Sequence, residues 1–300
     1  MLDISVIILT YNEEIHIRRC IENIKPVAKD IYVVDSFSTD KTIEIAEESG
    51  AKIFQNKWKK NHSKQLNWGL QHLPIQTKWV LRLDADEYFT DALITELKEK
   101  LADLPENISG VVFNRRHIFL GKWMKRGTYP VKLLRLFRAG KGICEQQFMD
   151  EHIQILEGDT LEFECDFVDH NLNSLDWWIS KHVGYSIREA IDLLNIEFNI
   201  YGNTEETKGL GAQALAKRKK KYKYSKYPLF WRSFAFFIYR YFFKLGFLEG
   251  KEGFLWHFLQ GWWYRTLVDS KVYEIKKACG SDKELIFNYV KDKYEICLKD

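Results

Sequence analysis

The sequence lacks the features that mark secreted, zinc-binding and membrane-spanning proteins. Its five cysteines are odd in number and widely scattered, with no Cys-x-x-Cys pair and no His/Cys ligand spacing. They indicate reduced cytosolic thiols, which excludes a disulfide framework and a cysteine-based zinc site. The N-terminal residues MLDISVIILTYNEE carry no basic segment, and their apolar run is too short for a signal peptide or a membrane span. We therefore expect the chain to stay on the cytosolic side.

Acidic residues are absent from one long stretch of the chain. Between Lys208 and Leu248 there is no Asp or Glu, although the stretch holds eleven basic residues. Without those eleven, the chain has 34 basic residues against 42 acidic ones, a balance of −8, whereas the whole chain carries +3. The sequence thus predicts an acidic body with one strongly basic segment.

The composition and periodicity predict a folded α/β protein. Hydrophobic residues make up 46% of the 300 residues, which suits one large α/β domain plus an appendage. Over the first hundred residues, short β-branched runs alternate with helical patterns, as in parallel βαβ units. We expect strands at residues 4–9, 31–34, 51–54, 79–83 and 110–118, and helices at residues 14–24, 41–49, 63–73 and 91–103.

Polar clusters directly follow three of these strands, at residues 10–14, 35–40 and 84–87. In open α/β sheets ligands bind beyond the carboxyl ends of the strands, so we expect the three clusters to meet at one rim. Asp84 and Asp86 lie in a segment expected to be extended, where alternate side chains point the same way and can offer both carboxylates to one divalent cation. The alternative is that these acids only cap the next helix.

Three motifs carry a family resemblance by their order and spacing: SVIILTYNEE, IYVVDSFSTDKTIEIAEESGAK and WVLRLDADE. The chain thereby resembles the inverting family 2 glycosyltransferases with the GT-A fold. Over most of residues 1–190, and more loosely in the aromatic tail, it is similar to the bacterial subgroup that includes lipopolysaccharide-core glucosyltransferases. The later matches are Gln65, Asn67, Arg115, Gly121–Trp123, Pro130, Arg135–Phe137 and Asp150–His152.

The resemblance implies a fold and a division of the chain. Residues 1–205 would form a GT-A nucleotide-sugar-binding domain of the α/β class, with a mostly parallel sheet flanked by helices. Residues 206–300 would form a C-terminal helical, aromatic and basic region that associates with membranes. The implied donor is a UDP-sugar, in the first instance UDP-glucose, and the implied cofactor is a divalent metal, Mg or Mn.

The resemblance also assigns residues to the donor and the metal. Four residues are assigned to the nucleotide base and ribose: Thr10, Tyr11, Asn12 and Glu14. Asp35 is assigned to uracil, Asp84 to the ribose and the metal, and Asp86 to the metal. Gln65, Asn67 and Arg135 complete the substrate-binding set. Independently, a Tyr ring beside carboxylates suits a nucleoside, because stacking supplies contact area and acids accept hydrogen bonds from the uracil imide and the ribose.

Two positions depart from the family pattern. Ser36 and Phe37 stand where many members have Asp-Gly, which removes one acid and leaves open a donor other than a uridine nucleotide. Leu66 stands where many members have Lys or Arg, which removes a phosphate contact for which Lys64 is the available replacement.

An inverting transfer needs a base that takes the acceptor proton as its oxygen attacks the anomeric carbon. The resemblance places this base in the segment Asp150-Glu151-His152, with Glu151 ahead of Asp150. From the residues alone, a solvated turn is an equal alternative. We expect His152 and His170 to be hydrogen-bonded structural residues rather than metal ligands.

Three arginines are candidates for holding phosphates or acceptor, with salt bridges to the acidic body as the alternative: Arg115, Arg116 and Arg135.

The C-terminal third is unusually aromatic. Nineteen of the 45 aromatic residues lie between Tyr222 and Tyr264, interleaved with the basic run. Arg232, Arg240 and Lys244 interrupt any lipid-spanning segment, so we predict an interfacial helix on an anionic membrane surface, followed by a second aromatic helix at residues 253–268. The residues at helical spacing are Phe230, Phe234, Phe237, Tyr241, Leu245 and Leu248.

Two alternatives compete with membrane binding. The aromatic stripe can pack on the catalytic domain, or the basic run can bind nucleic acid through phosphate contacts. No recognised nucleic-acid motif accompanies the charge, so no nucleic-acid partner is expected.

Together these inferences predict inverting transfer of a sugar from a UDP-sugar to a lipid-linked glycan, either lipopolysaccharide core or a capsule or exopolysaccharide precursor. The protein would be cytoplasmic and peripheral on the inner face of the cytoplasmic membrane. Transfer to a polyprenyl phosphate is one alternative, and a noncatalytic nucleotide-sugar-binding assembly protein is another. The presence of Asp84, Asp86 and Glu151 favours an enzyme.

Overall fold

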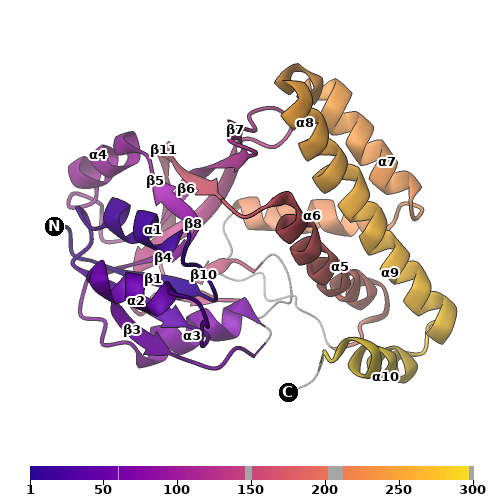
Figure 1. Ribbon diagram of the computed structural model, residues 1–300, viewed down its shortest axis with the longest axis horizontal. Helices are drawn as coiled ribbons and strands as arrows, with labels where there is room; N and C mark the ends of the chain where they lie inside the picture. Colours follow the sequence, from indigo (N-terminus) through magenta and orange to yellow (C-terminus); the bar gives the residue numbers. More distant parts are fainter. Residues whose placement is uncertain (60, 146–150, 202–211, 297–300) are drawn as a thin grey trace.

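The computed structural model describes residues 1–59, 61–145, 151–201 and 212–296. It contains an α/β part built around one sheet and a helical part that stands beside it (Figure 1). The strands are β1 (Ile4–Thr10), β2 (Asp30–Asp35), β3 (Lys52–Gln55), β4 (Trp79–Asp84), β5 (Glu87–Phe89), β6 (Ile108–Phe119), β7 (Lys122–Trp123), β8 (Val131–Arg138), β9 (Gly142–Cys144), β10 (Ile153–Ile155) and β11 (Asp159–His170).

Helices flank the sheet and make up the C-terminal half. Those of the α/β part are α1 (Ile17–Ile24), α2 (Thr42–Glu48), α3 (His62–His72) and α4 (Asp91–Lys100). Those that follow are α5 (Leu175–Phe198), α6 (Ala212–Ser225), α7 (Trp231–Ile238), the π-helix η1 (Tyr239–Phe243), the 3-10 helix η2 (Gly246–Glu249), α8 (Gly250–Trp256), the π-helix η3 (His257–Trp263), α9 (Tyr264–Cys279) and α10 (Lys283–Tyr294).

The sheet has a parallel half and a mixed half. Its strand order is β3-β2-β1-β4-β8-β6-β11-β5, with β7 paired to β6 at the side. Strands β1 to β4 pair in parallel, whereas β8 runs antiparallel to both β4 and β6. Strands β9 and β10 form a separate antiparallel pair. The observed strands and helices confirm the predicted α/β fold class, including the helical and aromatic C-terminal region.

Strand β1 is a nearly continuous apolar run, and its side chains are buried on both faces of the sheet. Ile4, Val6 and Ile8 pack in one buried cluster with side chains of α1, α2 and α4. Ile7 points to the other face, where it packs with Leu66 of α3. Both faces of this parallel strand are therefore covered, and no polar alternation is needed.

The helical part has its own core. Side chains of α5, α9 and α10 form one buried cluster that includes Ile191, Val268 and Val290. The predicted boundary at residue 205 falls in the range 202–211, outside the described residues. Because α5 packs on α9, we propose that the helical unit begins with α5 at Leu175.

A smaller apolar cluster joins the two parts. Phe119 at the end of β6 and Met124 beside β7 pack against Trp256 and Leu259 of the helical part. Some of the aromatic tail therefore packs on the α/β part, as one of the sequence alternatives proposed. In the part of the chain that the structure describes, no helix is both long and apolar enough to cross a bilayer.

One local prediction is wrong. The segment from Leu83 to Asp86 was expected to be extended, but β4 ends at Asp84, and Ala85 and Asp86 form the turn that leads into β5. The carboxylates of Asp84 and Asp86 are therefore not aligned by strand alternation. Asp84 ends the strand, Asp86 lies in the turn, and the two have different partners.

Candidate functional site

The three predicted polar clusters meet at one rim of the sheet. Thr10 pairs with Asp35 across β1 and β2, and Leu9 pairs with Asp84 across β1 and β4. The hydroxyl of Thr10 donates a hydrogen bond of 2.9 Å to Asp35 Oδ1. The carboxyl ends of three parallel strands thus lie side by side, as the sequence predicted.

The loops after β1 and β2 are fastened to each other. The backbone N–H of Asn12 donates to Ser38 Oγ at 2.8 Å, and the N–H of Thr39 donates to Asn12 Oδ1 at 2.8 Å. Asn12 has a φ of 56°, a left-handed conformation that Asn tolerates better than most residues. Glu14 accepts a hydrogen bond from the N–H of Lys41 through Oε2, at 3.1 Å.

Tyr11 and Asp35 differ in their access to solvent. Tyr11 is 59% exposed, which leaves its ring available for stacking. Asp35 is completely buried and accepts hydrogen bonds from Thr10 and from the N–H of Ser38, the latter at 2.9 Å. Tyr11 can contact a ligand directly, whereas Asp35 supports the residues around it.

Helix α3 reaches the same rim through Gln65 and Asn67. The side chain of Gln65 donates to Ser36 Oγ at 3.1 Å and to the carbonyl oxygen of Asn56 at 3.0 Å. The amide of Asn67 makes a reciprocal pair with the backbone of Cys144, with distances of 2.8 and 2.9 Å. Both side chains are engaged by the protein, so they position the loop after β2 and strand β9.

Two arginines surround Asp84. Arg82 lies 3.4 Å from Asp84 Oδ1, and Arg135 lies 3.3 Å from Asp84 Oδ2. Arg135 also forms an ion pair with the buried Glu87. Burial by itself raises the pKa of Asp84, but the charges of Arg82 and Arg135 outweigh it and hold this pKa well below its usual range.

Asp86 has no such cation in contact. Its Oδ2 accepts a hydrogen bond of 2.9 Å from Asn171. Loss of water around the carboxylate, together with the negative charge of Asp169, raises the pKa of Asp86 to about 6. Asp169 itself is paired with Arg115 at 3.2 Å and with His117 at 3.3 Å. The positive charge of Lys181 acts in the opposite sense but does not outweigh these two causes, so the negative charge of Asp86 is only partly compensated.

Glu151 lies at the edge of this carboxylate cluster. Its Oε1 is 3.4 Å from Arg82, the same guanidinium that contacts Asp84. The side chain is 15% exposed, so it reaches solvent at the rim. Asp150, the second candidate base, falls outside the described residues.

The histidines and the other two arginines have partners inside the protein. His152 contacts Glu145 Oε1 at 2.8 Å, and His170 Nδ1 lies 3.3 Å from Arg19. Arg116 forms an ion pair of 2.5 Å with Asp166. Both histidines are thus hydrogen-bonded, and Arg115, Arg116 and Arg135 all form salt bridges to acidic side chains.

Comparison with known proteins identifies the family. The model of the family described as "Glycosyl transferase family 2" matches residues 5–156, just over half of the chain. The chain belongs to glycosyl transferase family 2. The matched region contains the polar clusters after β1, β2 and β4 and extends to Glu151, and this confirms the resemblance inferred from the sequence motifs.

Three relatives show how far the similarity extends. An uncharacterized glycosyltransferase of Rickettsia typhi is 27% identical over 265 residues, 81% of this chain and 79% of its own length. One of Rickettsia bellii is 33% identical over 140 residues, 45% of this chain and 39% of its own length. The lipopolysaccharide core biosynthesis glycosyltransferase LpsC of Rhizobium meliloti is 30% identical over 146 residues, 47% of this chain and 53% of its own length. The chain therefore spans only about two fifths to a half of the last two relatives.

Among solved structures, the chain is similar to the glucosyl-3-phosphoglycerate synthase of Mycobacterium tuberculosis in complex with Mn²⁺, UDP and glucosyl-3-phosphoglycerate. The identity is 24%, over 38% of this chain and 44% of that one, with a TM-score of 0.32.

The family 2 chain offers ligands that suit a divalent cation. Asp84 and Asp86 supply hard carboxylate oxygens, and the negative charge of Asp86, unlike that of Asp84, is not compensated by an arginine pair. Among the residues that the structure describes, no three His, Cys, Asp or Glu side chains converge on one point. Magnesium in phosphate-binding sites is commonly held by one or two carboxylates plus substrate phosphates, and this donor set fits that arrangement.

The sequence analysis did not single out Lys181, whose charge interacts with that of Asp86. Lys181 of α5 is half-buried, with Nζ 4.4 Å from the ring centre of Trp177. Burial lowers the pKa of Lys181, but Tyr185, Asp86 and Glu13 outweigh it, so the net shift is upward. The signal was the spacing of Trp177, Lys181 and Tyr185, which places them on one face of a helix that begins just after the rim.

Proposed function

We propose that this family 2 glycosyltransferase transfers a hexose, glucose in the first instance, from a UDP-sugar to a hydroxyl of a lipid-linked glycan with inversion at the anomeric carbon. The observation that carries the proposal is the meeting of Asp84, Asp86 and Glu151 at the rim where the loops after β1 and β2 also end. The exposed ring of Tyr11 gives the nucleoside a place to stack.

The donor would lie across the carboxyl ends of β1, β2 and β4. Uracil would stack on Tyr11 and meet the loop that Asn12 and Asp35 hold in place. Because Asp35 is completely buried, we propose that it recognises uracil by orienting Thr10 and Ser38. The ribose would lie toward Asp84, and the diphosphate toward Asp86 and Lys181.

Asp86 and Asp84 would hold a divalent ion, Mg or Mn. When bound, such an ion neutralises the negative charge that develops on the leaving diphosphate. Lys181, whose positive charge acts on Asp86, would contribute to the same neutralisation.

Glu151 would act as the base. The acceptor hydroxyl gives its proton to the Glu151 carboxylate while its oxygen bonds to the anomeric carbon, and the bond from that carbon to the diphosphate breaks, so UDP leaves on the opposite face. Arg82 would fix the position of Glu151 relative to Asp84 through its contacts to both.

The proposed class of acceptor is supported by similarity to a named relative and not by the geometry of the rim. A relative with 30% identity is named for lipopolysaccharide core biosynthesis. We propose a lipopolysaccharide core or capsule precursor as acceptor, presented at the inner face of the cytoplasmic membrane. A polyprenyl phosphate acceptor remains the second candidate, because it would use the same donor and metal.

The test is a screen of UDP-sugars against lipid-linked acceptors, with UDP release as the measurement. We expect release that needs both an acceptor and Mg or Mn, and that is lost in Asp86→Ala. Release with polyprenyl phosphate alone would select the second candidate. Tight UDP binding without release for any acceptor would indicate a noncatalytic binding protein.

A further inference from the structure

Helices α7, η1, α8 and η3 form a hairpin that projects away from the sheet (Figure 1). Many of its aromatic side chains are exposed. Phe243 is 75% exposed and Trp231 is 73% exposed, values that are far above those of core residues. The further large apolar side chains exposed on this hairpin and its turn are Phe234, Tyr239, Phe242, Leu245, Phe247, Leu248 and Phe254. A patch of this extent on one element marks an interaction surface.

The two charged side chains of α7 and η1, Arg232 and Arg240, lie on the inside of the hairpin. Arg232 is buried and donates through Nε to Asp269 Oδ1 at 2.8 Å. Arg240, in the π-helix η1, is also buried and contacts Gln260 of η3. A helix that faces water turns its charges outward, whereas α7 and η1 bury both of theirs and expose aromatic rings such as Phe242 and Phe243. The outward face is therefore built for an apolar neighbour.

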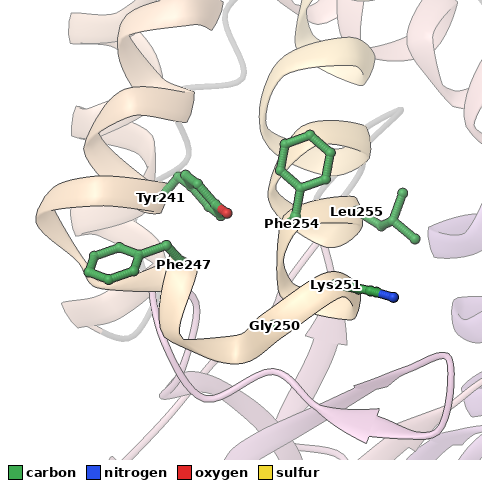
Figure 2. A pocket seen from close by; sticks show the side chains of 6 residues that line it. All are labelled: Tyr241, Phe247, Gly250, Lys251, Phe254 and Leu255. Atoms are coloured by element: carbon green, nitrogen blue, oxygen red, sulfur yellow. The ribbon is translucent and has the colours of Figure 1, made fainter.

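The apolar face is continuous across both arms of the hairpin. The rings of Phe254 and Phe258 stack at 6.0 Å, and Phe258 continues to Trp262 at 5.8 Å. Trp262 in turn contacts Phe234 of α7 at 5.0 Å. At the turn, an apolar cavity of about 540 Å³ lies between the arms, with Tyr241, Phe247 and Phe254 among its walls (Figure 2).

The charged side chains at the turn of the hairpin indicate what kind of partner its apolar face binds. Lys244 and Lys251 are exposed there, and Lys251 lines the cavity (Figure 2). The nearby acids are engaged: Glu249 is buried, and Glu252 is paired with Lys122 at 3.3 Å. A second copy of the chain docked by the same face would bring lysine against lysine. A bilayer instead offers an apolar interior and anionic headgroups, which complement both features.

We propose that this hairpin inserts its aromatic face into the boundary between headgroups and acyl chains of a lipid bilayer, with the turn around Phe243 and Leu248 deepest. The eight residues of α7 and five of η1 are at most about 20 Å long, shorter than the ~30 Å hydrocarbon core. Insertion of the hairpin would bring the rim to a lipid-linked acceptor, and this one consequence rests on the proposed function.

Insertion differs from the electrostatic anchor that the basic run suggested. On α6, Arg218 forms an ion pair with Glu145 and Lys221 forms one with Asp192 at 3.1 Å. Part of the basic run is thus used within the protein. Insertion also makes a distinct prediction, because burial of apolar surface persists at salt concentrations that screen surface charge.

The experiment is flotation of the full chain with phosphatidylcholine vesicles, with and without phosphatidylglycerol, at about 0.1 M and about 1 M salt, where the Debye length is about 10 and about 3 Å. We expect binding to both vesicle types at both salt concentrations. Phe243→Ser with Leu248→Ser should weaken binding roughly tenfold or more for each buried side chain removed. Leu285→Ser is the matched control, because Leu285 on α10 is 53% exposed, close to the 55% of Leu248.

The proposal is overturned if the double variant floats like wild type, or if binding needs phosphatidylglycerol and disappears at high salt. It is equally overturned if wild type is a dimer by sedimentation and the double variant is a monomer with unchanged flotation. Since both substituted side chains are exposed, the variant should fold, and its circular dichroism checks this. Vesicle binding without transferase activity in any donor and acceptor screen would keep the insertion and reject the proposed function.

Discussion

At the scale of single residues, the two carboxylates Asp84 and Asp86 differ in the charges that surround them. Asp84 lies between Arg82 and Arg135, so its charge is already compensated by the protein. Among the described residues, the carboxylate of Asp86 accepts a hydrogen bond from the amide of Asn171, and it feels the negative charge of Asp169 more strongly than the positive charge of Lys181. Asp86 is therefore the carboxylate that gains most from a bound cation.

Asp86→Ala should remove the metal dependence of UDP binding. Without this carboxylate the diphosphate loses its main counter-charge, so UDP affinity should no longer rise when Mg or Mn is added. Calorimetric titration of UDP with and without metal measures this. If the variant keeps the metal-dependent increase in affinity, Asp86 does not hold the ion.

Glu151→Gln should keep UDP affinity near normal while lowering turnover roughly 100- to 10,000-fold, because the amide preserves shape but cannot take the acceptor proton. Turnover and UDP affinity should be compared under saturating acceptor. Asp150→Asn is the control. A collapse in Asp150→Asn with near-normal turnover in Glu151→Gln would transfer the role to Asp150.

Lys181→Met should weaken donor binding roughly 10- to 100-fold, the usual value of a hydrogen bond to a charged group. Methionine keeps the length and apolar stem of the side chain and removes only its charge, so packing on Trp177 should persist. UDP affinity is the measurement, and Lys219→Met on the exposed side of α6 is the control. Equal affinity in both variants would show that Lys181 does not reach the diphosphate.

At the scale of elements, most of the α/β part was predictable because each element has one dominant local signal. The β-branched run of β1 and the helical spacing of α4 place their ends within a few residues of the observed ones. The turn at Ala85 and Asp86 was missed because it contains no Gly or Pro, and its shape depends on pairing of β5 with β11. The local sequence around Asp86 does not indicate that β5 pairs with the distant strand β11.

The hairpin shows a different limit of sequence reasoning. Phe237 belongs to the predicted interfacial stripe but is buried, whereas Phe243 was outside it and is exposed. The periodicity predicted a helix over α7 and η1 but not which of its faces is exposed. That was decided by Asp269 of α9, 37 residues from Arg232, which draws the guanidinium inward.

The pair Arg232 and Asp269 gives a test of this internal polarity. Asp269→Asn leaves a buried guanidinium without its counter-charge and should destabilise the protein by roughly 3–5 kcal/mol. Replacing both residues, Arg232→Met with Asp269→Leu, should recover most of that loss. Urea denaturation of the three proteins measures the free energies of unfolding. A double variant as unstable as the single one would mean that the pair is not an isolated unit.

At the scale of the whole molecule, the two parts are joined by contacts that start beside the carboxylate cluster. His117 of β6 contacts Asp169 and also packs on the ring of Trp256, with ring centres 4.2 Å apart. Glu249 accepts a hydrogen bond of 2.8 Å from the N–H of Arg126, in the segment that follows β7. The projecting hairpin is therefore held in a fixed relation to the rim, as a membrane-bound enzyme with a lipid-linked acceptor would need.

Two histidines of the helical part, the buried His257 and the half-buried His182, make the stability of the molecule depend on pH. Burial, and then the charge of Arg240, lowers the pKa of His257 to about 3. Burial is also the main cause that lowers the pKa of His182 to about 4. In the unfolded chain both groups return to about 6.5, so below that pH the unfolded state binds more protons than the folded state. At these two positions the folded state therefore loses stability as the pH drops from about 6.5 toward 4, whereas Asp86 and Glu87, whose pKa values burial raises to about 6 and about 8, act in the opposite sense.

Urea denaturation between pH 7.5 and pH 4.5 measures this slope. His257→Gln and His182→Gln should each flatten it, because neither variant has the group that takes up a proton on unfolding. His72→Gln is the control, since His72 is exposed at the end of α3. If His257→Gln and His182→Gln both leave the wild-type slope unchanged, or if His72→Gln changes it as much as they do, His257 and His182 do not contribute to it. A slope that survives in His257→Gln but not in His182→Gln would place the acid-sensitive contact between α5 and α9, where His182 packs against Tyr264 at 5.3 Å.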